Sequence, residues 1–75
     1  MAAPKGTTLP HVRAWRERRW LTQEKLANKA GVKVRTVQYA EHGGTVSART
    51  IWALADALEV TPDQLCFEAP DKVAV

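Results

Sequence analysis

The side chains with the clearest chemical capacity in this chain are cations, and they are distributed unevenly. Residues 1–49 carry ten Lys and Arg side chains against three Glu, a net charge of +7, whereas residues 50–75 carry a net charge of −4. A surface that concentrates one sign of charge attracts polyions of the opposite sign. The basic part of the chain therefore favours a polyanionic partner, and a solvated surface with uneven charge is the alternative.

Groups suited to covalent or metal chemistry are sparse. The chain has one cysteine, Cys66, and two isolated histidines, His11 and His42. A single cysteine cannot form an intrachain disulfide, and no His, Asp or Glu residues have the spacing of a ligand set. No phosphate-binding glycine loop or nucleophile–base pair is recognisable. We therefore expect no enzyme, no metal and no cofactor, with Cys66 a buried small apolar residue.

Seventy-five residues allow a single domain, near the size at which one core suffices. Residues 1–8 are rich in Ala, Pro, Gly and Thr and predict a flexible arm. Residues 9–67 have the apolar periodicity of a helical domain, and residues 68–75 form a polar tail. Because no signal-peptide core or membrane-length apolar run is present, we expect a cytoplasmic protein without membrane contact.

Three helices are predicted in the basic half. The first covers residues 10–19 and carries a stripe of apolar residues among its arginines. Thr22 suits the N-cap of a second helix, since its hydroxyl can accept a hydrogen bond from a free N–H group of the first turn. Gly31 can adopt the left-handed conformation that ends this helix at low cost. A third helix follows and stops at a Gly-Gly pair, Gly43–Gly44.

Two further helices are predicted in the acidic half. Ser47 suits the N-cap of a fourth helix, and a capping box begins at Thr61 and starts a fifth. The apolar stripe of the fourth helix consists of Ile51, Leu54, Ala55 and Leu58. No strand or hairpin pattern is evident, so the sequence predicts an all-α fold of five short helices.

Residues 9–65 resemble the phage repressor and Cro-type helix-turn-helix family, also called XRE-like. The family pattern, counted over a 20-residue window from Gln23, asks for five apolar residues, one small residue and one glycine. This chain supplies all seven: Leu26, Ala27, Ala30, Gly31, Val32, Val37 and Ala40. The Thr22–Gln23 opening and the segment LADALEV at 54–60 also match. The resemblance implies a lambda-repressor-like domain that binds double-stranded DNA, regulates transcription as a repressor, and inserts its third helix in the major groove.

Base contacts are implied for the outward residues of the third helix. These are Lys33, Val34, Arg35, Thr36, Gln38 and Tyr39. Arg35 is the strongest candidate, because a guanidinium can bond O6 and N7 of guanine together. Two alternatives stay open, namely that Val34 packs inward and that Tyr39 simply lies on the surface.

The remaining site residues are expected to hold the DNA backbone or to orient the third helix. Phosphate contacts are implied for Thr22, Gln23, Gly44, Thr45 and Arg49, in part through free N–H groups of the glycine loop. In the family, the positions of Arg16 and Glu41 form an ion pair between the first and third helices. The resemblance therefore assigns these two residues a structural role.

The choice of protein partner is left open by the sequence. Cro-type proteins dimerise, which implies a homodimer with a surface around Val46, Trp52, Leu65 and Phe67. The alternative function is a protein-interaction module, such as an antitoxin with a toxin partner or a coactivator-like domain with weak or nonspecific DNA binding. Trp20, at a position where the family often has glycine, and Trp52 would then carry partner contacts. The other interpretation is that both indoles cover gaps in a small core.

Overall fold

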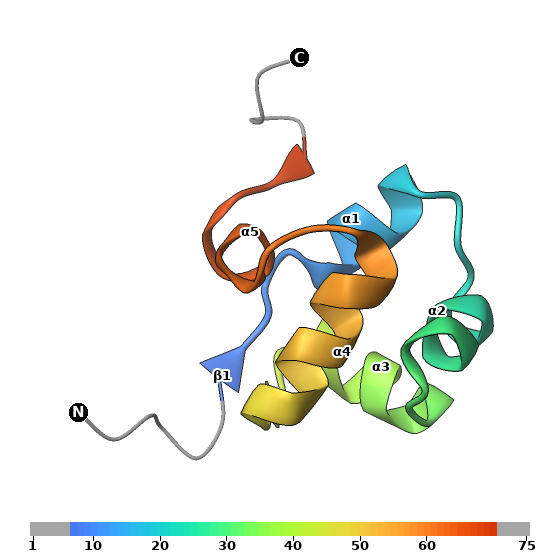
Figure 1. The fold of residues 1–75 in the computed structure, drawn as a ribbon. Coiled ribbons are helices and arrows are strands. Elements are labelled where there is room, and N and C mark those ends of the chain that lie inside the picture. Colours follow the sequence, from blue (N-terminus) through green and yellow to red (C-terminus); the bar gives the residue numbers. More distant parts are fainter. Residues whose placement is uncertain (1–6, 71–75) are drawn as a thin grey trace.

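Five helices and two short strands make up residues 7–70, the part of the chain that the computed structural model describes (Figure 1). In chain order they are β1 (Thr7–Thr8), α1 (Val12–Arg18), α2 (Gln23–Ala30), α3 (Val34–Glu41), β2 (Thr45–Val46), α4 (Ala48–Leu58) and α5 (Pro62–Phe67). Helix α4 packs against α1, α2 and α5, so the helices enclose one core. The predicted fold of five short helices is confirmed.

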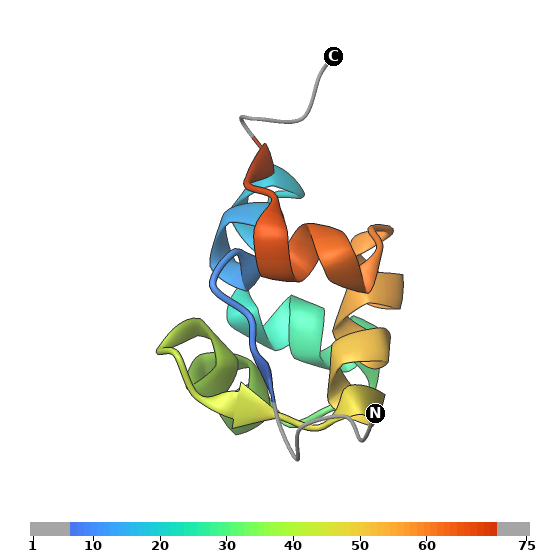
Figure 2. The ribbon, with the colours of Figure 1, turned by 90° about the vertical axis from the view of Figure 1, so that its left-hand side faces the viewer.

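The strand pair is the element that the sequence did not predict. β1 and β2 pair antiparallel, with Thr7 opposite Val46 and Thr8 opposite Thr45, where the N-terminal segment reaches the loop before α4 (Figure 2). Two-residue strands are too short to show an alternating pattern, and only the packing of the helices brings them together. The prediction of a flexible arm over 1–8 is wrong for Thr7 and Thr8. Residues 1–6, and residues 71–75 of the predicted tail, lie outside the described residues.

Side-chain caps begin three of the helices as predicted. The hydroxyl oxygen of Thr22 accepts from the N–H of Lys25 at 3.0 Å, and the hydroxyl of Ser47 accepts from the N–H of Thr50 at 3.3 Å. Thr61 forms a complete capping box at the start of α5. Each cap satisfies an N–H group that has no partner within its own helix.

Helices α1 to α4 all end in the same turn. A left-handed residue stands one position after α2 and α4 and two positions after α1 and α3. The next N–H donates to a carbonyl five residues earlier, as from Val32 to Ala27 at 3.0 Å. The left-handed residues are Trp20 (φ 59°), Gly31 (φ 74°), Gly43 (φ 88°) and Glu59 (φ 59°). Glycine adopts this conformation freely, whereas other residues are strained by roughly 1–2 kcal/mol. Gly31 was predicted for this role; Trp20 and Glu59 were not.

The core is apolar and includes one of the three tryptophans. Its buried residues are Leu9, Val12, Trp15, Leu26, Ala27, Val37, Ala40, Val46, Leu54, Ala55, Ala57, Leu58 and Leu65. Trp15 also links α1 to α5, because its indole N–H lies 2.8 Å from the carbonyl oxygen of Glu68 and 3.2 Å from that of Gln64. The indole thus bonds to the carbonyl of Glu68, which follows α5, and shares the carbonyl of Gln64 with the N–H of Glu68.

The other two tryptophans do not fill gaps in the core. Trp20 is 91% exposed and Trp52 is 65% exposed, so that interpretation is wrong for both. Cys66 is only half-buried, with its Sγ 4.0 Å from the carbonyl oxygen of Thr8, because Leu65 takes the inward position on α5. Neighbouring residues on a helix point in directions about 100° apart, and on the short helix α5 only Leu65 is buried.

The ion pair expected between Arg16 and Glu41 is present and largely buried. The side chains are 12% and 4% exposed, and Nε of Arg16 donates to Oε2 of Glu41 at 2.5 Å. A second guanidinium nitrogen donates to the carbonyl of Leu21 at 2.7 Å, and Gln23 Nε2 donates to Oε1 of Glu41 at 2.9 Å. The carboxylate therefore joins α1, the start of α2 and the end of α3.

Tyr39 packs on Gly44 at the end of α3. A Cβ atom on Gly44 would overlap three carbon atoms of the Tyr39 ring. The N–H of Gly44 donates to the carbonyl of Tyr39 at 2.8 Å, which holds the loop beneath the ring. Glycine is required here for the close approach of the ring rather than for its backbone angles. The contact limits the directions in which Tyr39 can point.

Glu41→Ala should lower the free energy of unfolding by about 3 kcal/mol, because it leaves the buried Arg16 guanidinium without its counter-ion. Chemical denaturation of the purified chain measures this loss. The matched control is Glu17→Ala, which breaks the exposed Arg13–Glu17 pair on α1 and should cost less than about 0.5 kcal/mol. Equal losses in the two variants would show that the buried pair does not organise the fold.

Gly44→Ala should lower the free energy of unfolding by about 1–3 kcal/mol, since the new methyl group must displace the Tyr39 ring. A double-mutant cycle with Tyr39→Ala tests the cause. With the ring removed, the added cost of Gly44→Ala should largely disappear. Additive losses would mean that the glycine is needed for another reason.

Candidate nucleic-acid interface

Helices α2 and α3 are held together at the turn around Gly31. Ala27 is buried where the helices approach, and the small side chain permits their close contact. On α3, Val37 and Ala40 are fully buried and anchor one face of the helix in the core. Because side chains three or four positions apart share a helix face, the residues between them must point away from the core.

The outward face of α3 carries the predicted base-contacting residues. Lys33, Arg35, Gln38 and Tyr39 are exposed, whereas Val34 and Thr36 are partly buried. No carboxylate between residues 7 and 70 pairs with Arg35, so its guanidinium is available to a ligand. Val34 packs partly against the core, which supports the inward alternative for this side chain.

Gln23 and Gln38 are linked across the two helices, a contact that sequence analysis missed. Nε2 of Gln38 donates to Oε1 of Gln23 at 3.3 Å, while Nε2 of Gln23 donates to the buried carboxylate of Glu41. Both residues were assigned separate DNA contacts. Their polar groups instead form a chain from Glu41 to the surface of α3, and only the packing angle of the helices brings the two amides together.

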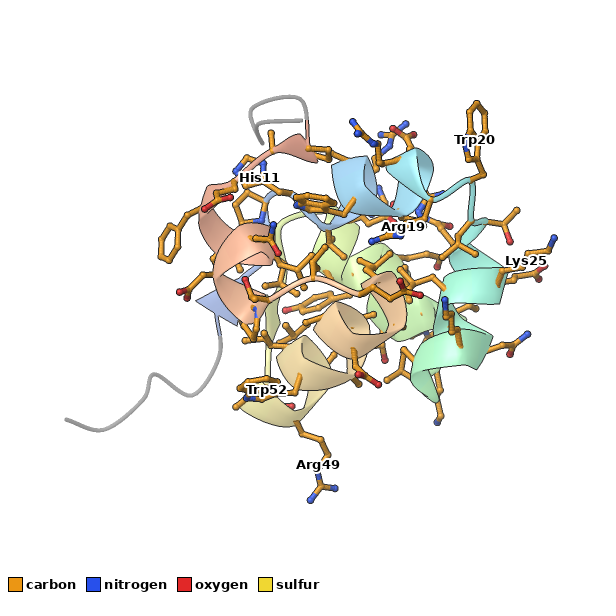
Figure 3. The ribbon with its side chains drawn as sticks, turned by 45° about the horizontal axis from the view of Figure 1, so that its top comes forward. His11, Arg19, Trp20, Lys25, Arg49 and Trp52 are labelled. Carbon is orange, nitrogen blue, oxygen red and sulfur yellow. The ribbon has the colours of Figure 1, made fainter. Side chains whose placement is uncertain are left out.

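The predicted phosphate-contacting residues lie at three helix or strand boundaries. Thr22 is the N-cap of α2, Thr45 lies in β2, and Arg49 lies in the first turn of α4. All three are exposed, and the Arg49 side chain points away from the body of the protein (Figure 3). Within the part of the chain that the structure describes, Arg49 has no ion-pair partner.

The expectation of free N–H groups in the glycine loop is wrong. The N–H of Gly43 donates to the carbonyl of Ala40 at 3.2 Å, and that of Gly44 donates to the carbonyl of Tyr39. The left-handed turn that ends α3 uses both donors, so neither is available to a phosphate. Gly44 is also half-covered by the Tyr39 ring. The glycine therefore shapes the site rather than binding a ligand through its N–H group.

The described residues contain little that could support catalysis or metal binding. Between residues 7 and 70, no group of three or more His, Cys, Asp or Glu residues is placed to hold a metal ion. Burial, and secondarily the charge of Asp63, raises the pKa of the Cys66 thiol, so it stays protonated at neutral pH and is a poor nucleophile. None of the helices in this range has the length and apolarity needed to cross a membrane.

Comparisons with known proteins agree with this geometry. The profile of the helix-turn-helix family matches residues 12–65. The crystal structure of the restriction-modification controller protein C.AhdI from Aeromonas hydrophila is similar, with 36% sequence identity and a TM-score of 0.69. The match covers 72% of this chain and 83% of the controller.

A second similar crystal structure is that of NHTF, a hypothetical transcription factor from Neisseria. It is 26% identical with a TM-score of 0.68, and the match covers 96% of this chain and 88% of NHTF. No curated protein matches this chain. The family match and both neighbours extend over most of the described helices, and the fold is that of DNA-binding regulators rather than of enzymes. The chain belongs to the helix-turn-helix family.

Proposed function

We propose that this protein is a transcriptional regulator, acting as a repressor, that binds double-stranded DNA sequence-specifically through α3. The observation that carries the proposal is the division of α3 into two faces. Val37 and Ala40 are fully buried, while Lys33 and Arg35 are exposed, and Arg35 has no ion-pair partner within residues 7–70. A helix anchored on one face and polar on the other can enter the major groove without unfolding.

The exposed groups divide into base readers and backbone anchors. Arg35 is the main base reader, and Lys33, Thr36 and Tyr39 lie on the same helix to supplement it. Gln38 acts through its bond to Gln23, which fixes the direction of its amide. Val34 contributes its exposed part to a thymine methyl group.

Backbone anchoring is assigned to the residues around α3. Arg49, the Thr22 hydroxyl, Thr45 and the N-terminal end of α2 at Gln23 supply positive charge or donors for phosphates. Gly44 contributes indirectly by holding the Tyr39 ring. Such contacts set the register of the protein on DNA but carry no sequence information. A regulator of this kind works where the chromosome is, in the cytoplasm.

A homodimer is the form that fits a recognition surface of one short helix. Two copies would place their α3 helices in successive major grooves, about 34 Å apart. Trp52 and Phe67 are exposed large apolar side chains on α4 and α5. Trp52 also lines a hollow with Val60, Pro62 and Asp63. The other two residues of the expected dimer surface, Val46 and Leu65, are buried in the core and cannot take part. We assign the dimer contact to the exposed pair.

The proposal is tested by selecting bound duplexes from a random DNA pool at about 150 mM salt, where nonspecific binding is weakened. We expect a consensus with two-fold symmetry. A pool that shows no enrichment, with binding that vanishes as salt rises, would contradict sequence-specific recognition. A short asymmetric consensus would contradict the dimer but not the DNA-binding role.

Arg35→Ala should reduce affinity for the selected duplex by about 10- to 100-fold and relax the preference at one position of each half-site, because a bidentate contact to guanine is lost. Arg49→Ala is the control. It should weaken binding to all duplexes alike and lower the slope of log affinity against log salt by about 1 per site. Titrations with matched and scrambled duplexes distinguish the two effects, and equal losses on both duplexes for Arg35→Ala would remove it from base readout.

Phe67→Ser and Trp52→Ser should each shift the protein toward the monomer, because both remove apolar area from the proposed contact. Sedimentation equilibrium over a range of protein concentrations measures the change. Thermal unfolding serves as the control, since exposed side chains contribute little to the core. If both variants keep the mass of the wild-type protein, the dimer contact lies elsewhere.

A further inference from the structure

Trp20 occupies a backbone position that suits glycine. Its φ is 59°, its N–H donates to the carbonyl of Glu17 at 3.0 Å, and the N–H of Leu21 donates to that of Arg16 at 3.1 Å. The same turn ends α2 and α3, where the left-handed residue is Gly31 or Gly43. In the turn after α1, a bulky side chain therefore replaces a residue that would be free of strain.

Glu59 is the other non-glycine residue with left-handed backbone angles, and its side chain makes contacts within the fold. Its carboxylate lies 3.7 Å from the nearest nitrogens of Arg19 and Lys29, and so it connects the ends of three helices. The Trp20 side chain makes no comparable contact within residues 7–70. Its indole is 91% exposed and, unlike that of Trp15, donates no hydrogen bond there. A strained residue that leaves a large apolar group in water points to a role outside the fold.

The two residues that precede Trp20 are arginines. Arg18 is exposed and pairs with no carboxylate of the described range. The Arg19 side chain is 40% exposed, lies 3.7 Å from the Glu59 carboxylate and donates to the Glu59 carbonyl oxygen at 3.5 Å. Tryptophan and arginine are often found at the centres of protein–protein contacts. Two arginines next to an exposed tryptophan in the chain favour a partner that offers carboxylates and an apolar side chain.

The position of Trp20 separates it from Arg49 and Trp52. Figure 3 shows Trp20 projecting at the opposite end of the molecule from both residues. A protein bound at Trp20 would therefore leave Arg49 and Trp52 uncovered.

We propose that Arg18, Arg19 and Trp20 form a docking site for an acidic segment of another protein. Carboxylates of the segment bind the two guanidinium groups, and an apolar side chain packs on the indole. We name these three residues the indole patch. This inference does not depend on the DNA sequence that the protein reads or on its oligomeric state.

The probe is a displayed library of random 16-residue peptides, selected against the full chain in the absence of DNA. We expect the enriched peptides to be negatively charged and to share an aromatic or large aliphatic residue. Trp20→Gly and Arg18→Glu should each weaken their binding by about tenfold or more, whereas Trp20→Phe should retain most of it. Enriched peptides without net negative charge, or peptides that bind Trp20→Gly equally well, would overturn the proposal, as would a library that yields no binders.

Thermal unfolding and DNA binding of Trp20→Gly separate docking from other roles of the indole. Because glycine relieves the left-handed strain, we expect the Tm to rise by about 4 °C and affinity for the duplex to stay unchanged. A lower Tm would show that the indole supports the fold. A loss of DNA affinity would instead identify Trp20 as a DNA contact, and a changed sedimentation mass would place a second copy on it. Each of these results would contradict an acidic protein partner.

Discussion

The carboxylate of Glu41 is the group on which the orientation of α3 depends. It lies at the end of α3, is almost fully buried, and accepts hydrogen bonds from Arg16 on α1 and Gln23 on α2. A buried charge is stable only while its partners stay in place, so the three helices cannot slide past one another without leaving it unpaired. The apolar core fills the space between the helices, but nondirectional packing alone would tolerate small rotations. The hydrogen bonds of Glu41 limit those rotations.

The buried Glu41 carboxylate also orders part of the protein surface, through the side-chain amides of Gln23 and Gln38. Gln23 bonds to Glu41 on its inner side and to Gln38 on its outer side, and so a buried charge fixes the direction of a side chain on the exposed face of α3. At the other end of the helix, the Tyr39 ring rests on Gly44. Preorganised side chains lose less conformational entropy when they bind than free ones do. The outward face of α3 is therefore already partly ordered before any ligand binds.

The left-handed turns that follow α1 to α4 share one backbone conformation but carry different side chains. Four helices finish in the same left-handed turn, yet only two of the left-handed residues are glycine. Glu59 contacts two cations, and Trp20 leaves its indole in solvent. The turn after α1 thus exposes an indole, and the left-handed angles of Trp20 lower the stability of the fold. The outward face of α3 and the exposed residues of α4 and α5 are the other two surfaces to which we assign partners.

The sequence by itself determined the number of helices, their caps, most of the core and the outward residues of α3, because caps and apolar stripes act within a few residues. It also identified the Arg16–Glu41 pair through the family pattern. Only the tertiary structure decided the contacts between distant segments: the β1–β2 pairing, the Gln23–Gln38 link, the ring of Tyr39 on Gly44 and the exposure of Trp20 and Trp52. Each of these depends on the distance and angle between elements. Local sequence patterns carry no record of that geometry, since it arises when all five helices pack at once.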